Sequence, residues 1–115
     1  MTQCILVVDD DREIVNAIAI LLEKEGYQVL KAYDGLQALD LLATRPVHLI
    51  LMDVMMPKLD GLSAILRIRE RKNLPIIILS AKSEETDKVL GLSMGADDYV
   101  AKPYNSQELA ARVRS

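Results

Sequence analysis

The sequence predicts a doubly wound α/β domain, in which helices cover both faces of a five-stranded parallel sheet. Five short segments have the length and composition of strands, and three of them, Cys4 to Val8, the run from Leu49 up to Asp53, and Pro75 to Leu79, are apolar runs rich in Ile, Leu and Val. A stretch with helical spacing of apolar residues follows each segment, and Asp, Asn or Gly residues mark the ends of these helices. Such alternation is typical of a parallel sheet with helical crossovers.

The length and composition fit one compact domain, which we expect to span residues 1–115. Half of the 115 residues are hydrophobic, and the net charge of −3 gives no reason to expect direct binding to nucleic acid or to an acidic membrane. Cys4 is the only cysteine, so a reducing, cytoplasmic setting is expected. No apolar run is long enough to cross a bilayer and no signal sequence is recognised, so we expect a soluble domain without a membrane partner.

The first strand is expected over Cys4 to Val8, with Cys4 as a small buried residue, and it stops at three consecutive aspartates. The third of these, Asp11, is expected to cap the helix that follows, and Gly26 to end that helix. The predicted apolar face of the helix comprises Ile14, Ala17, Ile18, Leu21 and Leu22.

The second strand is expected over Gln28 to Ala32. Asp34 then offers a helix cap, with Gln37 at the third helical position, and the helix carries Leu39 and Leu42. The third strand begins at Leu49 and ends abruptly in Asp53. Because the residues before Asp53 are all apolar, we place this strand at the centre of the sheet. Pro57 cannot continue a strand and marks where the loop has begun.

The remaining elements repeat the pattern. We expect a helix after Asp60 and Gly61, with Leu62, Ile65 and Ile68 on its apolar face, and then a strand over Pro75 to Leu79. A helix over Glu84 to Met94 is expected next, and Gly95 ends it. The last strand is expected over Asp98 to Ala101, and the segment Asn105 to Glu108 caps a final helix that carries Leu109 and Val113.

Three carboxylates are predicted to meet at one edge of the sheet. If the strand order reverses beside the first strand, the ends of the first and third strands flank the switch point and place Asp9 and Asp10 beside Asp53. At separations near 5 Å and an effective dielectric of about 20, each pair of charges repels by roughly 3 kcal/mol. Either a proton is taken up or a cation binds, and oxygen ligands alone suit Mg²⁺ better than zinc.

Two more polar side chains follow other strands at the same edge. Ser80 offers a hydroxyl after the fourth strand and Lys102 an ammonium after the fifth, and both could contact a phosphoryl group. Asp53 is then the natural nucleophile, since carboxylates can form acyl phosphates. Taken singly, Ser80 could be a turn hydroxyl and Lys102 a surface charge. His48 is expected to be structural.

The sequence resembles the receiver (CheY-like) domains of two-component response regulators, most closely those of the OmpR/PhoB subfamily. The resemblance covers essentially the whole chain. It is carried by four segments, Ile5 to Asp11, Leu51 to Pro57, Leu79 to Ala81 and Gly95 to Pro103. It implies a flavodoxin-like sheet with strand order 2-1-3-4-5 and five helices.

The resemblance also implies an activity and a metal. Asp53 would accept a phosphoryl group from a phosphohistidine of a sensor histidine kinase. Mg²⁺, with Mn²⁺ as a substitute, would be held by Asp9, Asp10, Asp53 and the backbone carbonyl of Met55. Ser80 would hydrogen-bond to the phosphoryl group and Lys102 would pair with it, with a cis peptide bond between Lys102 and Pro103. Such a domain modifies itself and is not a turnover enzyme.

By the same resemblance, Tyr99 is the aromatic residue that turns from exposed to buried on activation. The fourth helix, fifth strand and fifth helix would then form a two-fold dimer. The charged residues expected on that face are Lys88, Asp97, Asp98, Glu108 and Arg112, whereas Ser93 departs from the acidic residue common there. A solvated charged surface is the alternative. A DNA-binding domain, absent from this chain, would carry the transcriptional output.

Two other classes of protein remain open. A haloacid-dehalogenase-like phosphatase needs a second Asp two residues after the first, where this chain has Met55. A structural or ligand-binding flavodoxin-like module would leave the acid pair and the Lys102-Pro103 segment unexplained. Nucleotide hydrolysis has no support, because no glycine-rich phosphate loop follows any of the predicted strands.

Overall fold

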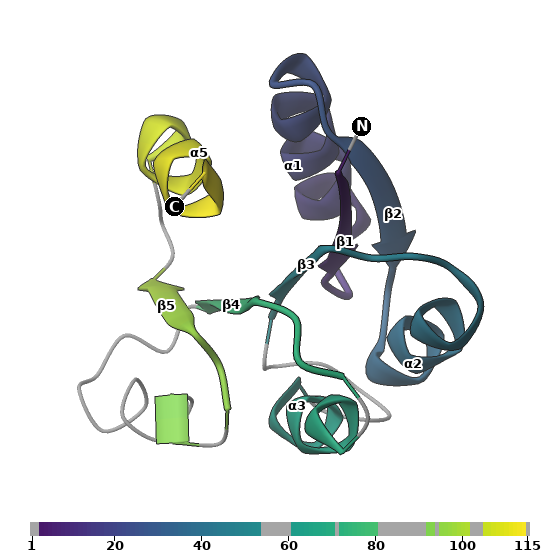
Figure 1. Ribbon diagram of the computed structural model, residues 1–115. Coiled ribbons are helices and arrows are strands. Elements are labelled where there is room, and N and C mark those ends of the chain that lie inside the picture. Colours follow the sequence, from purple (N-terminus) through teal and green to yellow (C-terminus); the bar gives the residue numbers. More distant parts are fainter. Residues whose placement is uncertain are drawn as a thin grey trace.

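Figure 1 shows the protein as a computed structural model, which describes residues 3–53, 61–70, 72–80, 92–93, 95–101 and 105–114. The strands are β1 (Cys4–Val8), β2 (Gln28–Ala32), β3 (Leu49–Met52), β4 (Ile76–Ser80) and β5 (Asp98–Ala101). The helices are α1 (Arg12–Lys24), α2 (Gly35–Thr44), α3 (Gly61–Arg69) and α5 (Ser106–Arg114). The helix expected over Glu84 to Met94 lies outside the described residues except for positions 92–93, which are helical.

The five strands form one sheet in the order β2-β1-β3-β4-β5, and every neighbouring pair is parallel. The predicted fold class and strand order are therefore confirmed. The chain moves from β1 outward to β2 and then crosses to β3 on the other side of β1. The direction of winding reverses there, so the carboxyl ends of β1 and β3 flank the position where ligands bind in sheets of this type.

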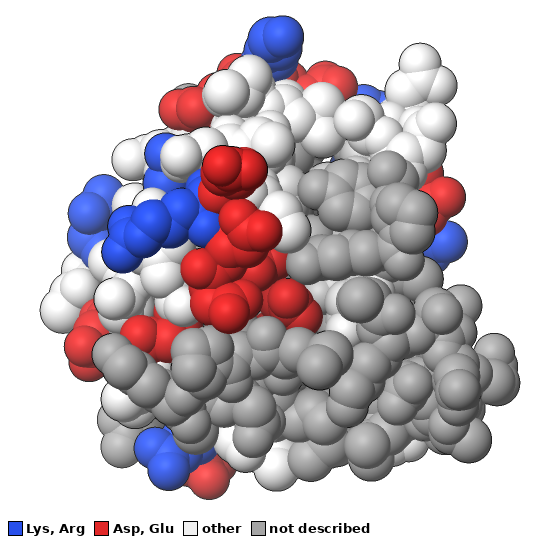
Figure 2. All heavy atoms as spheres, turned by 180° about the vertical axis from the view of Figure 1, so that it is seen from behind, with Lys and Arg blue, Asp and Glu red and all other residues white. Residues whose placement is uncertain are grey.

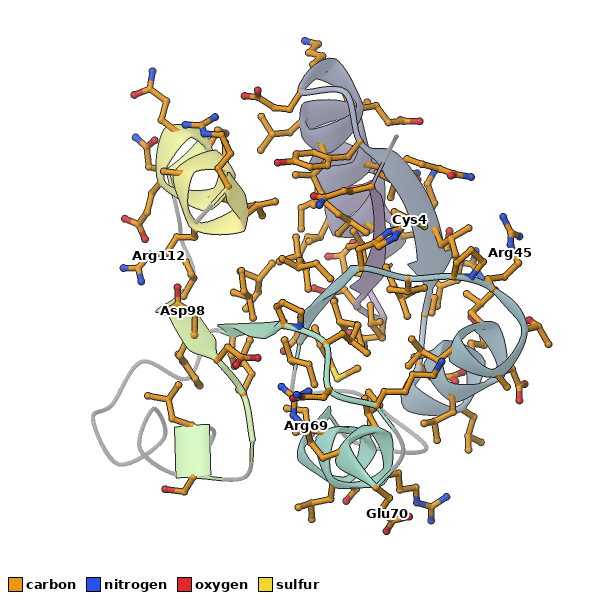
Figure 3. The ribbon with its side chains drawn as sticks, viewed as in Figure 1. Cys4, Arg45, Arg69, Glu70, Asp98 and Arg112 are labelled. Carbon is orange, nitrogen blue, oxygen red and sulfur yellow. The ribbon has the colours of Figure 1, made fainter. Side chains whose placement is uncertain are left out.

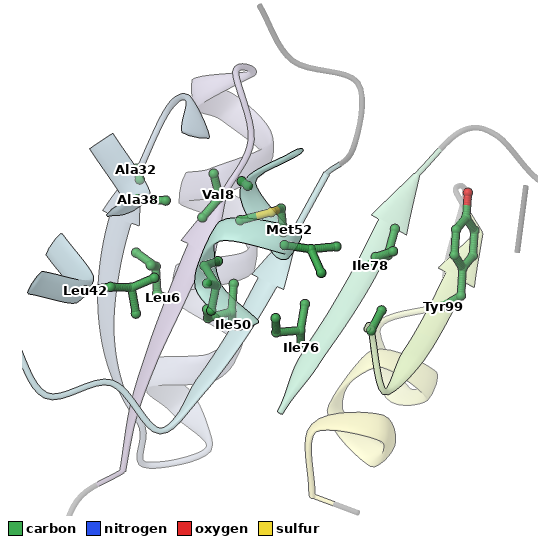
Figure 4. Close-up of a cluster of buried hydrophobic side chains, with 14 residues drawn as sticks. Leu6, Val8, Ala32, Ala38, Leu42, Ile50, Met52, Ile76, Ile78 and Tyr99 are labelled. Atoms are coloured by element: carbon green, nitrogen blue, oxygen red, sulfur yellow. The ribbon is translucent and has the colours of Figure 1, made fainter. Parts of the chain in front are cut away.

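Helices α1 and α5 lie on one face of the sheet, and α2 and α3 lie on the other (Figure 1). Each face has its own aliphatic core. Figure 4 shows the core under α2 and α3, to which β1 contributes Leu6 and Val8. Ile5 and Val7 point into the second core, under α1 and α5. Side chains alternate between the two faces along a strand, which explains why buried strands read as unbroken apolar runs.

Side chains cap the helices where the sequence predicted caps. Asp11 accepts hydrogen bonds from the backbone nitrogens of the second and third residues after it, at 3.0 and 3.4 Å. Asp34 accepts one from the backbone nitrogen of Gln37 at 2.8 Å, and Asn105 caps α5 in the same way. Gly26, with φ +96°, follows the end of α1. The left-handed conformation there favours glycine.

Some details differ from the sequence-based expectations. Ala17 is exposed, and the buried face of α1 comprises Val15, Ile18, Ala19 and Leu22. The Gln37 side chain accepts its hydrogen bond from Tyr33, at 2.9 Å, rather than from the cap residue Asp34. The fourth strand begins one residue later than predicted and includes Ser80, because Ser80 pairs with Ala101.

Candidate functional site

The backbone of the sheet sets Asp9 and Asp53 side by side. The amide nitrogen of Asp53 donates a 2.9 Å hydrogen bond to the carbonyl oxygen of Val8, which immediately precedes Asp9. The amide nitrogen of Asp9 in turn donates to the carbonyl oxygen of Ala32, at 3.2 Å. Both aspartates thus leave the sheet at the same edge, at the carboxyl ends of the adjacent strands β1 and β3.

The three predicted acidic residues come together at this edge. One carboxylate oxygen from each of Asp9, Asp10 and Asp53 lies within 4.8 Å of the other two. Asp9 and Asp53 are buried, at 3% and 7% exposure, whereas Asp10 is exposed. Asp9 is held in place because one of its carboxylate oxygens accepts a 3.0 Å hydrogen bond from the amide of Asp11. From behind, acidic side chains gather in a patch that runs down the centre of the view (Figure 2).

This donor set fits a hard divalent cation. All three side chains offer carboxylate oxygens, which are ligands that Mg²⁺ prefers. Opposite ligands of an octahedral Mg²⁺ lie about 4.2 Å apart, twice the metal–oxygen distance of about 2.1 Å, so the cluster is close to the required size. An exposed member leaves one side open to solvent, as a site that exchanges metal and substrate requires.

Ser80 lies at the same edge of the sheet, as the last residue of β4. It is fully buried and pairs with Ala101 of β5. Met52 of β3 pairs with Ile78 of β4, and Ser80 is two residues beyond Ile78. Ser80 and Asp53, which follows Met52, therefore lie at the same edge of the sheet. The other predicted site residues, Met55, Lys102 and Pro103, lie outside the described residues.

Tyr99, the predicted switch residue, is buried at 8% exposure in the core under α2 and α3. It pairs with Ile78 of β4, and its amide nitrogen donates a 2.8 Å hydrogen bond to the carboxylate of Asp98. The Tyr99 side chain is therefore buried in this structure, beside Ile78 on the same face of the sheet (Figure 4).

Two aspartates of the predicted dimer face are paired within the protomer. One guanidinium nitrogen of Arg112 lies 2.9 Å from each carboxylate oxygen of Asp98, and this hydrogen bond raises the pKa of Arg112 above its ordinary value (Figure 3). Asp97 pairs with Arg69 of α3 at 2.7 Å. Of the other predicted members, Glu108 is exposed on α5 and Lys88 lies outside the described residues.

Sequence reasoning missed two cationic contacts near the ends of strands. Arg69 contacts the segment before β5, and the Arg12 guanidinium lies 3.9 Å from the centroid of the Tyr33 ring. No spacing rule connects these partners, so the sequence carried no signal for either. His48 has a structural contact, as expected, because its Nδ1 atom accepts a 2.9 Å hydrogen bond from the amide of Cys4.

A separate hollow lies between α2 and α3, away from the acid cluster. It has a volume of about 700 Å³, and its lining includes Leu39, Leu42, Arg67 and Lys72. None of the three clustered aspartates lines it. The acid cluster lies at the carboxyl edge of the sheet, and the spacing of its oxygens matches an ion and its ligands. Within the part of the chain described, no helix has both the length and the apolar composition that crossing a membrane requires.

Comparisons with known proteins agree on one family. The family model of the response regulator receiver domain matches residues 5–114. The transcriptional regulatory protein CpxR of Escherichia coli (strain K12) is 50% identical over 111 residues, which are 96% of this chain and 47% of that protein. The chain spans about half the length of the curated relatives it matches.

Two solved structures are similar over nearly the whole chain. The receiver domain of the Francisella response regulator 1452 has a TM-score of 0.94 at 40% identity, covering 98% of this chain and 94% of that one. The BeF3-activated receiver domain of DrrB has a TM-score of 0.90 at 33% identity, covering 99% and 96% of the two chains.

Proposed function

The chain belongs to the response regulator receiver domain family, and on that premise we propose that it is a phosphoacceptor switch in which Asp53 takes a phosphoryl group from a sensor histidine kinase. The observation that carries this proposal is the cluster of Asp9, Asp10 and Asp53 at the carboxyl edge of the sheet. Burying a carboxylate beside two others costs free energy, because desolvation and the neighbouring negative charges both disfavour its ionised form. A role for Asp53 in binding a cation and accepting a phosphoryl group would account for this costly arrangement.

The proposed reaction is a single displacement at phosphorus. A carboxylate oxygen of Asp53 attacks, a new oxygen–phosphorus bond forms, and the phosphorus–nitrogen bond of the donor phosphohistidine breaks. The imidazole leaves with the electron pair and takes up a proton, so the product is an aspartyl phosphate. The chain modifies itself and is not a turnover enzyme in this proposal.

Four groups would hold the metal. Asp9, Asp10 and Asp53 offer carboxylate oxygens and Met55 its backbone carbonyl, and Mn²⁺ could replace Mg²⁺ because it accepts the same ligands. The bound cation would neutralise charge on the carboxylates and on the phosphoryl oxygens. Asp9 needs no rearrangement for this role, since the amide of Asp11 already fixes its carboxylate.

Ser80 and Lys102 would bind the phosphoryl group once it is on Asp53. Ser80 would donate its hydroxyl and Lys102 would pair with the added charge of about −1.5 to −2. Tyr99, which is buried beside Ile78 of β4, would move between an outward and an inward position, and phosphorylation would favour the inward one. A bias of about 5.5 kcal/mol takes such an equilibrium from mostly off to mostly on.

The output would be dimerisation and control of transcription. We propose a two-fold dimer through the segment around positions 88–112, of the kind formed by OmpR/PhoB-type receivers, with Lys88, Asp97, Asp98, Glu108 and Arg112 at the interface. DNA would be bound by a further domain, which is in keeping with a chain about half the length of its curated relatives. The partner kinase would meet the domain in the cytoplasm.

Mass spectrometry of the intact protein tests the proposal. We expect wild type incubated with acetyl phosphate and Mg²⁺ to gain the mass of one phosphoryl group, and EDTA to prevent the gain. Asp53→Asn should gain nothing, while Asp40→Asn, a change of an exposed carboxylate on α2, should behave as wild type. Wild type that stays unmodified, or equal labelling of Asp53→Asn, would reject the proposal.

A further inference from the structure

Arg69, at the end of α3, donates four hydrogen bonds to neighbouring segments of the chain. Its Nε and one terminal nitrogen donate to the carbonyl oxygen of Gly95 at 3.0 and 2.8 Å, and the other terminal nitrogen donates to the carbonyl oxygen of Leu74 at 2.6 Å. The nitrogen that contacts Gly95 also bonds to the carboxylate of Asp97 at 2.7 Å. One side chain therefore joins α3, the segment before β4 and the segment before β5.

Asp97 extends this network to the sheet. Its Oδ2 atom, which contacts Arg69, also accepts a 2.8 Å hydrogen bond from the amide of Ile76, and its own amide donates to the carbonyl oxygen of Ile76 at 2.8 Å. Ile76 is the first residue of β4 and Asp97 directly precedes β5. The two bonds fix the relative start of these neighbouring strands.

The backbone at Gly95 is shaped to receive Arg69. Its φ of +121° is a conformation that residues with side chains rarely adopt, and a Cβ atom at this position would lie 3.1 Å from Cγ of Arg69. The Arg69 side chain is 21% exposed, and its bonds to the carbonyl oxygens of Gly95 and Leu74 are partly buried. Its bond to Asp97, a side chain that is 56% exposed, faces solvent. Figure 3 shows Arg69 lying between α3 and the strands.

The register of β5 depends on this starting point. In the described sheet β5 is an edge strand of four residues that pairs with β4 alone. A slip by one residue would turn Tyr99 from the core under α2 and α3 to the opposite face, and would move Ala101 away from Ser80. Lys102 is the next residue in the sequence.

We propose that Arg69 is a positioning residue for the phosphoryl site. By fixing Gly95 and Asp97 at the start of β5, it sets the register that holds Tyr99 beside Ile78 and brings the end of β5 to Ser80. Arg69 touches none of the reacting groups, and its effect passes through the strand. The inference rests on the proposed phosphoacceptor function for its kinetic consequence, but the register itself can be measured without any phosphodonor.

The test compares Arg69→Gln with Arg69→Lys and with the matched control Arg67→Gln, which changes an exposed arginine of the same helix. We expect Arg69→Gln to lower the rate of phosphorylation by acetyl phosphate at saturating Mg²⁺ by about 10-fold or more, as displacements remote from the reacting atoms can do. Mg²⁺ affinity should be unchanged, because the metal ligands follow β1 and β3. Arg69→Lys should be intermediate and Arg67→Gln should equal wild type.

Hydrogen exchange of the wild type and variants provides the second readout. Amides of residues 98–101 should exchange faster in Arg69→Gln, while those of β1 should not change. Three results would each overturn the inference. They are unchanged exchange over residues 98–101, an unchanged phosphorylation rate, and a fall in that rate matched by a fall in Mg²⁺ affinity.

If Arg69→Gln does not fold, Asp97→Asn removes the charge partner of Arg69 and is expected to show the same pattern. A wild type that is never phosphorylated would reject the proposed function and leave the exchange result to decide the register.

Discussion

The backbone hydrogen bond from Asp53 to Val8, 2.9 Å long, fixes the carboxylates of Asp53 and Asp9 at the ends of adjacent strands. The acid cluster is therefore a property of the sheet, because the pairing of β1 with β3 sets it. Repulsion among these close like charges opposes folding, and a bound cation would offset it.

Asp53→Asn should therefore stabilise the metal-free protein. With repulsion of roughly 3 kcal/mol for each charge pair at about 5 Å, partly screened by solvent at Asp10, we expect a gain of about 1 to 3 kcal/mol in the free energy of unfolding in EDTA. Urea titration measures it. Mg²⁺ at ten times its dissociation constant should then add about 1.4 kcal/mol to wild type and much less to the variant. A variant that is less stable than wild type in EDTA would show that repulsion in the cluster is negligible.

Asp34→Ala should destabilise the fold through α2. The Asp34 carboxylate is buried and accepts the amide of Gln37 at 2.8 Å, so its loss leaves that donor without its cap. Substitutions of this kind cost about 0.5 to 2 kcal/mol, and Asp34→Asn should cost less because Asn also caps helices. Thermal and urea unfolding measure the difference. Asp40→Ala, on the exposed side of α2, is the control, and an equal loss from both variants would contradict the capping role.

Beryllofluoride with Mg²⁺ should convert the protein to a dimer. Light scattering measures the change, and Arg112→Ala should weaken the dimer because it removes a charge from the proposed interface. Arg112 already pairs with Asp98 of the same chain. In the dimer, Arg112 must therefore either keep this ion pair or replace it with an ion pair to the second chain. Arg67→Ala, on α3, should dimerise as wild type does. A protein that stays monomeric would remove the dimer from the proposal.

The stability contributed by Cys4 should depend on pH. Burial raises the pKa of the Cys4 thiol, and the charge of Arg45 offsets only part of that effect. Because the folded protein keeps the thiol neutral, ionisation favours the unfolded chain once the pH exceeds the ordinary thiol pKa of about 8.5. The stabilisation by Cys4 is thus complete below that pH and declines above it.

The measurement is the difference in unfolding free energy between wild type and Cys4→Ala from pH 7 to 10. The two proteins differ only at position 4, so the difference isolates the thiol. It should shrink with rising pH, by at most about 1.4 kcal/mol per pH unit. A difference that is constant with pH would contradict the raised pKa.

Much of the fold could be predicted because β1, β3 and β4, the inner strands of the sheet, leave continuous apolar runs, and the edge strands β2 and β5 are each followed by a helix. The bounds of β1, β2 and β5 were predicted as observed, and β4 was displaced by one residue because Ser80 is polar yet pairs within the ladder. The face of α1 was only partly predicted. Ala17 fits the helical spacing of apolar residues but is exposed. Alanine is small and occurs on both buried and exposed faces of helices, so its presence does not indicate which face of α1 it occupies.

The contacts of Arg69 could not be predicted. Its partners Leu74, Gly95 and Asp97 lie up to 28 positions away in the sequence. Three of its four hydrogen bonds go to backbone carbonyl oxygens, which every residue type has, so the sequence does not identify them as partners. The acid cluster differs in this respect. Its members directly follow strands, and strand order alone brings them together, so pattern and topology were sufficient.

The central claim is that phosphorus becomes attached to Asp53. Reduction of the acetyl phosphate-treated protein with borohydride converts an aspartyl phosphate to homoserine, and peptide mass spectrometry then locates the altered residue. We predict that the change falls on Asp53 alone, requires Mg²⁺ and is lost in Asp53→Asn. A modification on Asp9 or Asp10 instead, or no modification of wild type under these conditions, would contradict the account.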